Sequence, residues 1–409
     1  MKIWFKYIIG IGLGTVLALL STPDNTFFTQ TITFLTEYTI QFGRYSLYPA
    51  VFFAFTVSIF ELRENKQLLK IILWSIVLLC SFAVLLAIIG LCITIIHAPA
   101  RIPIFTEGAT DMQLLGVRES FLQLFPSSSM EVFTNGTYLL PLCIFASFAG
   151  AGCAVDKTIS KPAITLFDSL ARISYTVLVF FVDMFAFGMI ILSTYWMVQF
   201  RTMLLRSVFT DFALVLFLTI LFISLVFYPA IIKLLCREAN PYRILYASLA
   251  PMLAAFFSGD SHIALCVALR HTNESLGIRR RISTVVLPIF SIFGRAGSAL
   301  VITISFIVVL KSYSSLTIKL QDMAWLFGMS ALFSCFLGRF PVGGTYIALA
   351  ALCALYGRGF ESGYLILKPA AFIISSTATV LNTLNAIAGT YIIGYHCNLI
   401  HTKDLRFFI

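Results

Sequence analysis

Long runs of apolar residues alternate with short polar segments along the first 235 residues of the chain. They lie near residues 4–21, 45–61, 70–97, 138–155, 170–198 and 209–235. A helix that crosses a bilayer needs about 20 mostly apolar residues, so each run predicts one membrane span. The first run is long and lacks a small-residue cleavage site, so we expect a span there and not a signal peptide.

Two later stretches are broken in the middle by polar and small residues. The stretch ILYASLAPMLAAFFSGDSHIALCVALRH breaks at residues 258–261, and MAWLFGMSALFSCFLGRFPVGGTYIALAALCALYG breaks at 338–344. A polar turn at membrane depth must be enclosed by protein or line a cavity, because lipid cannot pair its backbone groups. A kinked helix would explain either break alone. Two such breaks in one chain instead predict a pair of re-entrant helical hairpins, 245–270 and 322–357, around a transporter binding site.

Two more apolar runs, near 283–310 and 364–396, carry unusual polar residues. The first holds Arg295, with no other charge between Ser283 and Leu310. A guanidinium at the centre of a membrane helix costs about 2.5–3.5 kcal/mol on insertion scales, so Arg295 needs a partner or a task. The second run holds the polar set Ser375, Ser376, Thr377, Thr379, Asn382, Thr383 and Asn385.

The composition supports a membrane protein with several spans. Hydrophobic residues make up 59% of the 409 residues and charged residues 11%, against about 25% charged in soluble domains. The net charge of +10 comes from lysines and arginines in alternate loops, which predicts that both termini and the base of the first hairpin are cytoplasmic. No basic and aromatic patch indicates nucleic-acid binding.

The sequence offers little for catalysis or metal binding. The nine cysteines show no paired spacing, so we expect no metal or other cofactor. We expect small buried thiols at four of them, because they lie inside apolar runs: Cys80, Cys92, Cys143 and Cys153. We find no HExxH motif, no Ser/His/Asp constellation and no carboxylate pair, so we do not expect an enzyme.

Six segments resemble the dicarboxylate/amino acid:cation symporters, the glutamate transporter family. They are LYPAVFFAFTVSIFELREN, FTNGTYLLPLCIFASFAGAGCAV, AAFFSGDSHIAL, LPIFSIFGRAGSAL, LGRFPVGGTYIALA and SSTATVLNTLNAIAGTYI. The resemblance covers nearly the whole chain and implies an all-α membrane protein with eight transmembrane helices and two re-entrant hairpins. It further implies a homotrimer in the lipid of the cytoplasmic (inner) membrane. A scaffold part (1–66 and 136–205) would support a transport part (67–100 and 206–409) that moves like an elevator.

The resemblance also implies where the substrate would bind. Side chains at three matching positions would contact the substrate: Asn382, Thr379 and Ser298. Backbone groups at the two hairpin tips would contact it as well, at Ser261, Phe340 and Gly344.

Two positions depart from the family pattern. Ser375 replaces the aspartate for an α-amino group, as in members that carry C4-dicarboxylates, and Ala378 replaces the arginine for a side-chain carboxylate. Arg339 or Arg295 are the candidates to replace that arginine, because a planar guanidinium binds carboxylate bidentately. Arg339 is alternatively a solvated tip residue. Asp260 is expected either to bind an amino group or to pair with Arg295.

The sodium sites of the family are eroded in this chain. Gly294, Ala296 and Ala386 stand where the family has an asparagine and two aspartates, and Ile76, Leu79 and Cys80 replace its third-span hydroxyl residues. We hypothesise that the guanidinium of Arg295 supplies the positive charge that sodium would bring.

Coupling would then not depend on sodium. Asp260 and His262 are the titratable candidates for proton coupling, with Arg295 as the fixed charge. The alternatives are a hydrogen-bonded buried His262 and a purely structural ion pair between Arg295 and Asp260.

Three functions remain open at this point. The first is a secondary transporter of small carboxylates, either acidic amino acids or C4-dicarboxylates. The second is a transporter or exchanger of neutral amino acids with the same fold. The third is an anion channel or a sensor that has lost coupled transport.

Overall fold

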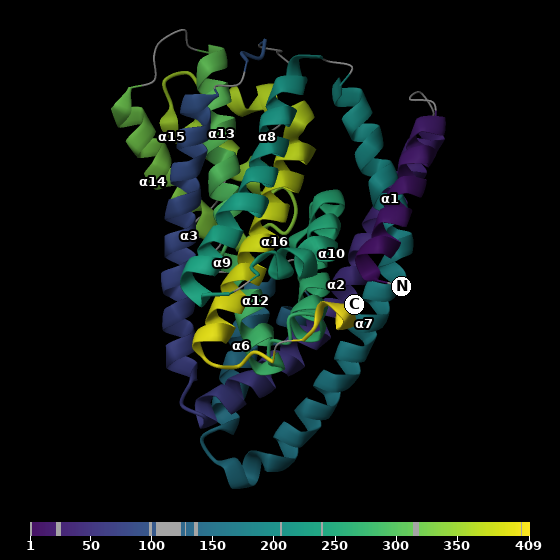
Figure 1. Cartoon of the computed structure of the whole chain (residues 1–409), viewed down its shortest axis with the longest axis vertical. Coiled ribbons are helices and arrows are strands. Elements are labelled where there is room, and N and C mark those ends of the chain that lie inside the picture. Colours follow the sequence, from purple (N-terminus) through teal and green to yellow (C-terminus); the bar gives the residue numbers. More distant parts are fainter. Residues whose placement is uncertain are drawn as a thin grey trace.

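The structure is a computed structural model in which helices account for nearly all regular structure (Figure 1). It describes residues 2–21, 26–97, 100–103, 124–126, 128–134, 138–204, 207–238, 240–313, 319–401 and 403–409. These residues form no β-strand, only an isolated bridge between Ile278 and Ile400. The predicted all-helical class is confirmed for this part of the chain.

The N-terminal half supplies long helices that pack side by side. They are α1 (Ile3–Leu20), α2 (Thr26–Glu64), α3 (Leu68–Ile96), the short α5 (Glu131–Thr134), α6 (Leu139–Cys153) and α7 (Lys157–Leu204). Helices α1 and α2 both pack along α7, and α6 packs on α2. The predicted scaffold helices therefore contact one another. The division into scaffold and transport parts stays a prediction, and four of its boundaries, 1, 136, 205 and 206, lie outside the described residues.

The C-terminal half alternates continuous and broken helices. It contains η1 (Ser207–Phe209), α8 (Thr210–Phe222), η2 (Ile223–Phe227), α9 (Tyr228–Cys236), α10 (Tyr242–Ser258), α11 (Ser261–Glu274), α12 (Arg280–Phe293), α13 (Ala296–Tyr313), α14 (Leu320–Phe336), η3 (Leu337–Arg339), α15 (Gly344–Tyr356), η4 (Gly363–Ala370), α16 (Ala371–His396) and η5 (Leu405–Phe407). Helix α13 packs on α3, and α10, α12 and α13 pack around α16.

Eight helices among the described residues are long and apolar enough to cross a membrane. They differ from the eight expected spans at two places. The expected span at 138–155 forms α6, which has 15 residues and is shorter than the about 20 that a span needs. The first half of the second hairpin, Leu320–Arg339, has 20 residues and is long enough by itself.

Both breaks expected from the sequence fall between helices. Gly259 joins α10 to α11 with φ of +60°, and Gly343 precedes α15 with φ of +72°; a glycine suits both because this left-handed region costs it no steric strain. In Figure 1, α14 and α15 lie toward the upper end of the bundle and α10 lies lower. Their tips meet, because the backbone N–H of Ser261 donates to the carbonyl of Pro341 at 3.1 Å.

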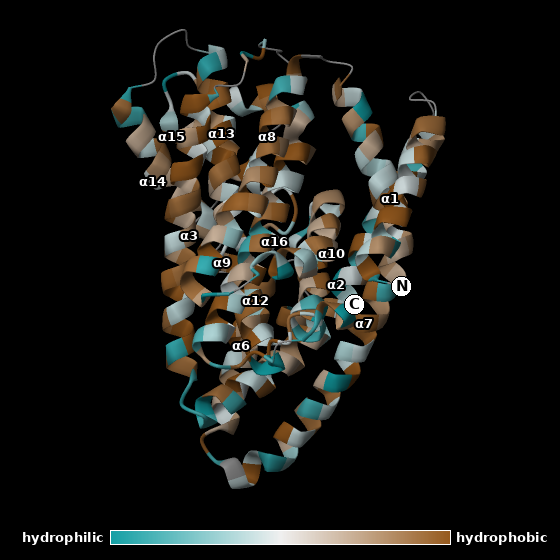
Figure 2. Ribbon diagram, viewed as in Figure 1, coloured by the Kyte–Doolittle hydropathy of each residue, from teal (hydrophilic) through white to brown (hydrophobic). Residues whose placement is uncertain are grey.

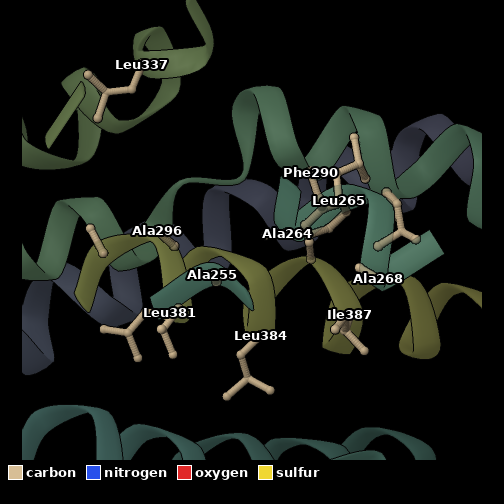
Figure 3. Packing of buried hydrophobic residues seen from close by; sticks show 14 of the residues in the cluster. Ala255, Ala264, Leu265, Ala268, Phe290, Ala296, Leu337, Leu381, Leu384 and Ile387 are labelled. Carbon is tan, nitrogen blue, oxygen red and sulfur yellow. The ribbon is translucent and has the colours of Figure 1, made fainter. Parts of the chain in front are cut away.

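Helix α11 of hairpin one forms the buried centre together with α13 and α16. Nearly all residues of α13 and α16 are buried, and Ala264 and Ala268 lie where α11 crosses α16 (Figure 3). The outer helices differ, since α3 and α8 are hydrophobic over most of their length (Figure 2) and expose side chains such as Leu73, Val77 and Phe217. Apolar side chains on the outside are what a lipid environment requires. Cys80 and Cys92 of α3 are also exposed, so the expectation that they are buried was wrong, because an apolar run can face lipid as well as protein.

The two chain ends lie next to each other. The ammonium of Lys2 donates to the carbonyl of Leu405 at 3.4 Å, and to the hydroxyl of Tyr246 at 2.8 Å. Figure 1 shows both termini at the same side of the bundle. This is the arrangement expected if both ends face the same compartment.

Candidate functional site

Arg295 lies where the two hairpin tips meet. It follows Gly294 in the break between α12 and α13, and it is 5% exposed. Its Nη1 donates to the carbonyl of Phe340 on the second tip at 2.6 Å, and its Nη2 donates to Oγ of Ser261 on the first tip at 2.9 Å. Its Nε donates to the carbonyl of Ser291 at 3.1 Å. One guanidinium therefore joins both hairpins to α12.

All three acceptors of Arg295 are neutral oxygens. A guanidinium carries five N–H donors, so two donors remain after these three bonds. Within the described part of the chain, no carboxylate oxygen lies within 4.0 Å of the Arg295 guanidinium nitrogens. A buried positive charge without a paired carboxylate is costly, and an anion at the remaining donors would offset that cost.

Asp260 caps α11 and is fully buried. Its Oδ1 accepts the backbone N–H of His262 at 2.6 Å, and its Oδ2 accepts from Nη2 of Arg44 at 2.8 Å. Arg44 belongs to α2, in the other group of helices. The expected pairing of Asp260 with Arg295 is therefore absent, because Arg44 takes the carboxylate instead.

His262, the second titratable candidate, is 1% exposed and faces α2. Its Nδ1 lies 3.4 Å from the hydroxyl of Tyr48, and the two rings meet edge to face at 5.9 Å. This is the hydrogen-bonded buried histidine that the sequence left as an alternative.

Asn382 of α16, a predicted substrate residue, forms hydrogen bonds with Ser298 of α13. Its Oδ1 accepts the backbone N–H of Ser298 at 3.0 Å, and its Nδ2 donates to Oγ of Ser298 at 2.9 Å. Thr345 on the second hairpin donates to the same Oγ at 3.1 Å. One turn earlier, Thr379 donates to the carbonyl of Gly259 at the first tip at 3.2 Å. The predicted residues of α13 and α16 thus meet both hairpins.

Close packing of α13 on α16 depends on Gly297. A Cβ at this position would lie 2.4 Å from Cβ of Leu381 and 2.9 Å from the backbone N of Asn382. Backbone atoms cannot move aside as a flexible side chain can, so this contact requires a glycine. The hydrogen bonds of Asn382 with Ser298 rely on this approach.

A cavity of about 450 Å³ lies between the tips and the long helices α2 and α7. Its walls include Ser258 and Gly259 of the first tip, Val342 and Gly343 of the second, and Ser375 of α16. Further lining residues are Thr33, Thr36, Glu37, Ile40, Tyr195, Trp196, Phe257, Tyr346, Ile347, Ala371, Phe372 and Ser376. Its size suits a small molecule. Ser375 lies on its wall as predicted, whereas Ala378 is 1% exposed and does not line it.

A much smaller cavity, of about 20 Å³, lies on the α12 side of Asn382. Ser261, Ser291 and Thr383 also line it. Ser261 and Ser291 both accept from Arg295. This space holds at most about one water-sized group.

Two positions where the resemblance implies lost acidic cation ligands lie inside the protein. Ala296 and Ala386 are 1% and 5% exposed, and the carbonyl of Gly294 accepts from Nδ2 of Asn385 at 2.7 Å. Among the residues that the structure describes, no group of three His, Cys, Asp or Glu side chains could hold a metal ion.

Arg339 and Gly344 complete the second tip. Arg339 is half-buried in η3, and its guanidinium lies over the ring of Phe340 at 5.6 Å. A Cβ on Gly344 would lie 3.5 Å from Nη1 of Arg295. Gly344 therefore lies beside the central guanidinium, while Arg339 stacks on its neighbour.

Three contributing residues were not identified from the sequence. Arg44 and Thr345 bond the predicted residues Asp260 and Ser298, and Trp196 donates to Oγ of Ser376 on the cavity wall at 3.0 Å. Arg44 carried a usable signal, because it is a cation that directly precedes the apolar run 45–61. Thr345 and Trp196 had none, since their partners are far away in the sequence.

The comparisons with known proteins identify one family. Its sequence model, the Sodium:dicarboxylate symporter family, matches residues 3–395 of this chain. No curated protein matches the chain closely enough to count as a relative.

Proposed function

The chain belongs to the sodium:dicarboxylate symporter family, and from this premise we propose that it carries small carboxylates across the cytoplasmic membrane without sodium. The observation that carries the proposal is Arg295, a buried guanidinium that bridges both hairpin tips and has no carboxylate partner among the described residues. It offers a permanent positive charge where a coupling cation would be needed.

The contacts of Arg295 support this replacement. A coupling cation in such a site must satisfy oxygen atoms and balance the charge of an anionic substrate. Nη1 of Arg295 satisfies the tip carbonyl of Phe340, and the guanidinium stays charged at any physiological pH. Alanines stand at two of the expected carboxylate positions, 296 and 386, so the charge that would attract sodium is missing.

We propose that the substrate binds between the tips and α16. Its carboxylate would meet the two remaining donors of Arg295 and the side chains of Asn382 and Thr379. Asn382 and Ser298 bond each other here, so they would exchange these bonds for bonds to the substrate. Ser375 offers a hydroxyl and no charge for an amino group, which favours a C4-dicarboxylate over an acidic amino acid.

The proposed movement is an elevator in a homotrimer, with both termini cytoplasmic. Helices α1, α2, α6 and α7 would stay fixed while the hairpins, α12, α13 and α16 move together. The contacts that favour one moving unit are those of Arg295 and Asn382, because they connect both tips, α13 and α16. Substrate would be enclosed by the tips in transit, and the two hairpins would be re-entrant.

Uptake into liposomes tests this proposal. Purified protein would be reconstituted, and labelled succinate, aspartate, glutamate and alanine would be offered with and without a sodium gradient. Saturable uptake of succinate or aspartate that ignores sodium supports the proposal. Uptake that requires sodium contradicts the replacement of the cation. Uptake of alanine alone indicates a neutral amino acid carrier, and binding or steady current without uptake indicates a sensor or an anion channel.

A further inference from the structure

Three charged side chains lie around the first hairpin tip, namely a half-buried guanidinium, a buried guanidinium and a buried carboxylate. Arg44 and Arg295 carry the positive charges, and Asp260 carries the negative charge. We propose that Arg44 is a positioning residue that keeps the site attractive to anions, because it holds Asp260 away from Arg295. This inference rests on the proposed function of the same site.

Asp260 contacts Arg44 directly and is the sequence neighbour of a residue that Arg295 contacts. Its side chain is 0% exposed and lies 2.8 Å from Arg44, whose own side chain is 21% exposed. The next residue, Ser261, accepts from Nη2 of Arg295 at 2.9 Å. In the proposed switch, a change of the Asp260 rotamer would transfer its carboxylate from Arg44 to Arg295.

The pairing decides which cation is left for the substrate. One carboxylate neutralises one guanidinium, so the three groups together carry a net charge of +1. While Asp260 is bound to Arg44, this charge resides on Arg295, between the tips. If Asp260 moved to Arg295, the unpaired positive charge would pass to Arg44, and an anionic substrate between the tips would have to compete with a buried carboxylate.

Arg44 lies on a surface that fits hairpin one closely. A Cβ on Gly43 would lie 2.1 Å from Cδ1 of Ile263, and the carbonyl of Gly43 accepts from Sγ of Cys266 at 3.6 Å. One turn later, Tyr48 meets His262. Helix α2 thus presents Gly43, Arg44 and Tyr48 to α11 in one row.

Movement of hairpin one along α2 would break this row and its ion pair. A buried carboxylate that loses its partner is strongly destabilised, so Asp260 would turn to Arg295, the cation that moves with it. The affinity for an anion would then be high with α2 docked and low after the movement. By thermodynamic linkage, a bound anion would favour the docked arrangement by the same factor.

Binding measurements on four variants test the inference. The dissociation constants of succinate and L-aspartate would be measured by titration calorimetry for the full chain, Arg44→Met, Asp260→Asn, the double variant and Arg63→Met. We expect Arg44→Met to weaken binding by on the order of tenfold or more. The double variant should bind several-fold more tightly than Arg44→Met, because the competing carboxylate is gone. Arg63, which lies on the same helix and bonds the carbonyl of Ala151, is the matched control and should leave binding unchanged.

Equal dissociation constants for Arg44→Met and the unmodified protein would overturn the inference. A double variant that binds no more tightly than Arg44→Met would overturn it as well. If the unmodified protein binds neither probe, the proposed function fails, and a measurement without ligand decides the inference. Nitroxide labels on cysteines at the exposed positions Leu166 in α7 and Leu234 in α9, in a background without other cysteines, report the distance between the helix groups. Arg44→Met should shift this distance distribution and the double variant should restore it; unchanged distributions would refute the proposal.

Discussion

The two hairpin tips meet at one point but are held in different ways. The first tip is anchored by charged and polar side chains, since Asp260 pairs with Arg44 and Ser261 accepts from Arg295. The second tip is anchored through the backbone carbonyls of Phe340 and Pro341. Their helices differ as well: twelve of the 14 residues of α11 are buried, whereas only four of the 17 in α14 are.

This difference assigns unequal roles to the hairpins. Helix α11 of hairpin one lies in the protein interior, and its Asp260 forms a largely buried ion pair with Arg44 of α2. Removing one partner of a buried ion pair destabilises a protein by about 3–5 kcal/mol. In hairpin two, nine of the 13 residues of α15 are buried, but only four of the 17 residues of α14 are. Regions with few buried contacts open at low free energy, so we expect hairpin two to open to admit substrate while hairpin one stays closed.

Replacing Arg295 should have the largest effect, because both tips and the substrate lose their common donor. Arg295→Met is expected to weaken binding of succinate or aspartate by at least about 100-fold, since two hydrogen bonds to a charged group contribute roughly 1.5–3 kcal/mol each. The buried Thr345, replaced by cysteine in a background without other cysteines, should also react faster with a water-soluble maleimide. Arg172→Met, at a mostly exposed arginine, is the control. Unchanged affinity in Arg295→Met would show that Arg295 does not bind the substrate.

Filling the contact between α13 and α16 should be the next largest effect. Gly297→Ala places a Cβ against the backbone of Asn382, and overpacking of this kind costs about 1–3 kcal/mol. Thermal unfolding in detergent should show a lower midpoint, with loss of binding. Gly328→Ala is the matched control, because nothing lies within 4 Å of that added atom. If both variants unfold at the same temperature, the packing of α13 on α16 does not depend on a glycine at position 297.

Removing one side-chain contact of hairpin one should give an intermediate effect. Ser261→Ala takes away the Oγ that accepts from Arg295 and donates to the carbonyl of Pro341 at 3.3 Å. The loss of one bond to a charged donor predicts about tenfold weaker binding. Ser248→Ala, which removes a buried hydroxyl from the same hairpin away from the tip, should change binding far less. An equal loss in both variants would mean that hairpin one is destabilised in general.

The smallest effect is expected at the second tip. Arg339 stacks over Phe340, so Arg339→Met should weaken binding less than about threefold, in line with a cation–π contact at a partly exposed site. Titration with succinate and aspartate gives the comparison. A loss greater than that of Ser261→Ala would show that Arg339, and not Arg295, binds the carboxylate.

The sequence was sufficient to predict most of the helices, and it singled out residues that lie together at the two tips, whose role in binding stays a prediction. Apolar runs and their two polar breaks predicted the elements, because burial in lipid or protein imposes these patterns directly. A lone arginine in an apolar run correctly marked Arg295 as a residue with partners inside the protein. The length of α6 was overestimated, since apolar composition alone does not show where a helix ends.

The partner of Asp260 was beyond such an analysis. Residues 44 and 260 are 216 positions apart, and only the packing of α2 on α11 brings them together. The same limit applies to Thr345 and Ser298, which come from different helices. Local patterns identify which residues need a partner, and the tertiary structure decides which partner each of them receives.

The sodium dependence of binding tests the replacement of the cation by Arg295 most directly. The affinity of the unmodified protein for succinate and aspartate would be measured in sodium chloride and in choline chloride at equal ionic strength. We predict the same dissociation constant in both salts, because the positive charge is built into the chain. An affinity that rises with sodium would contradict the account, since an ion would then bind where Arg295 is proposed to act alone.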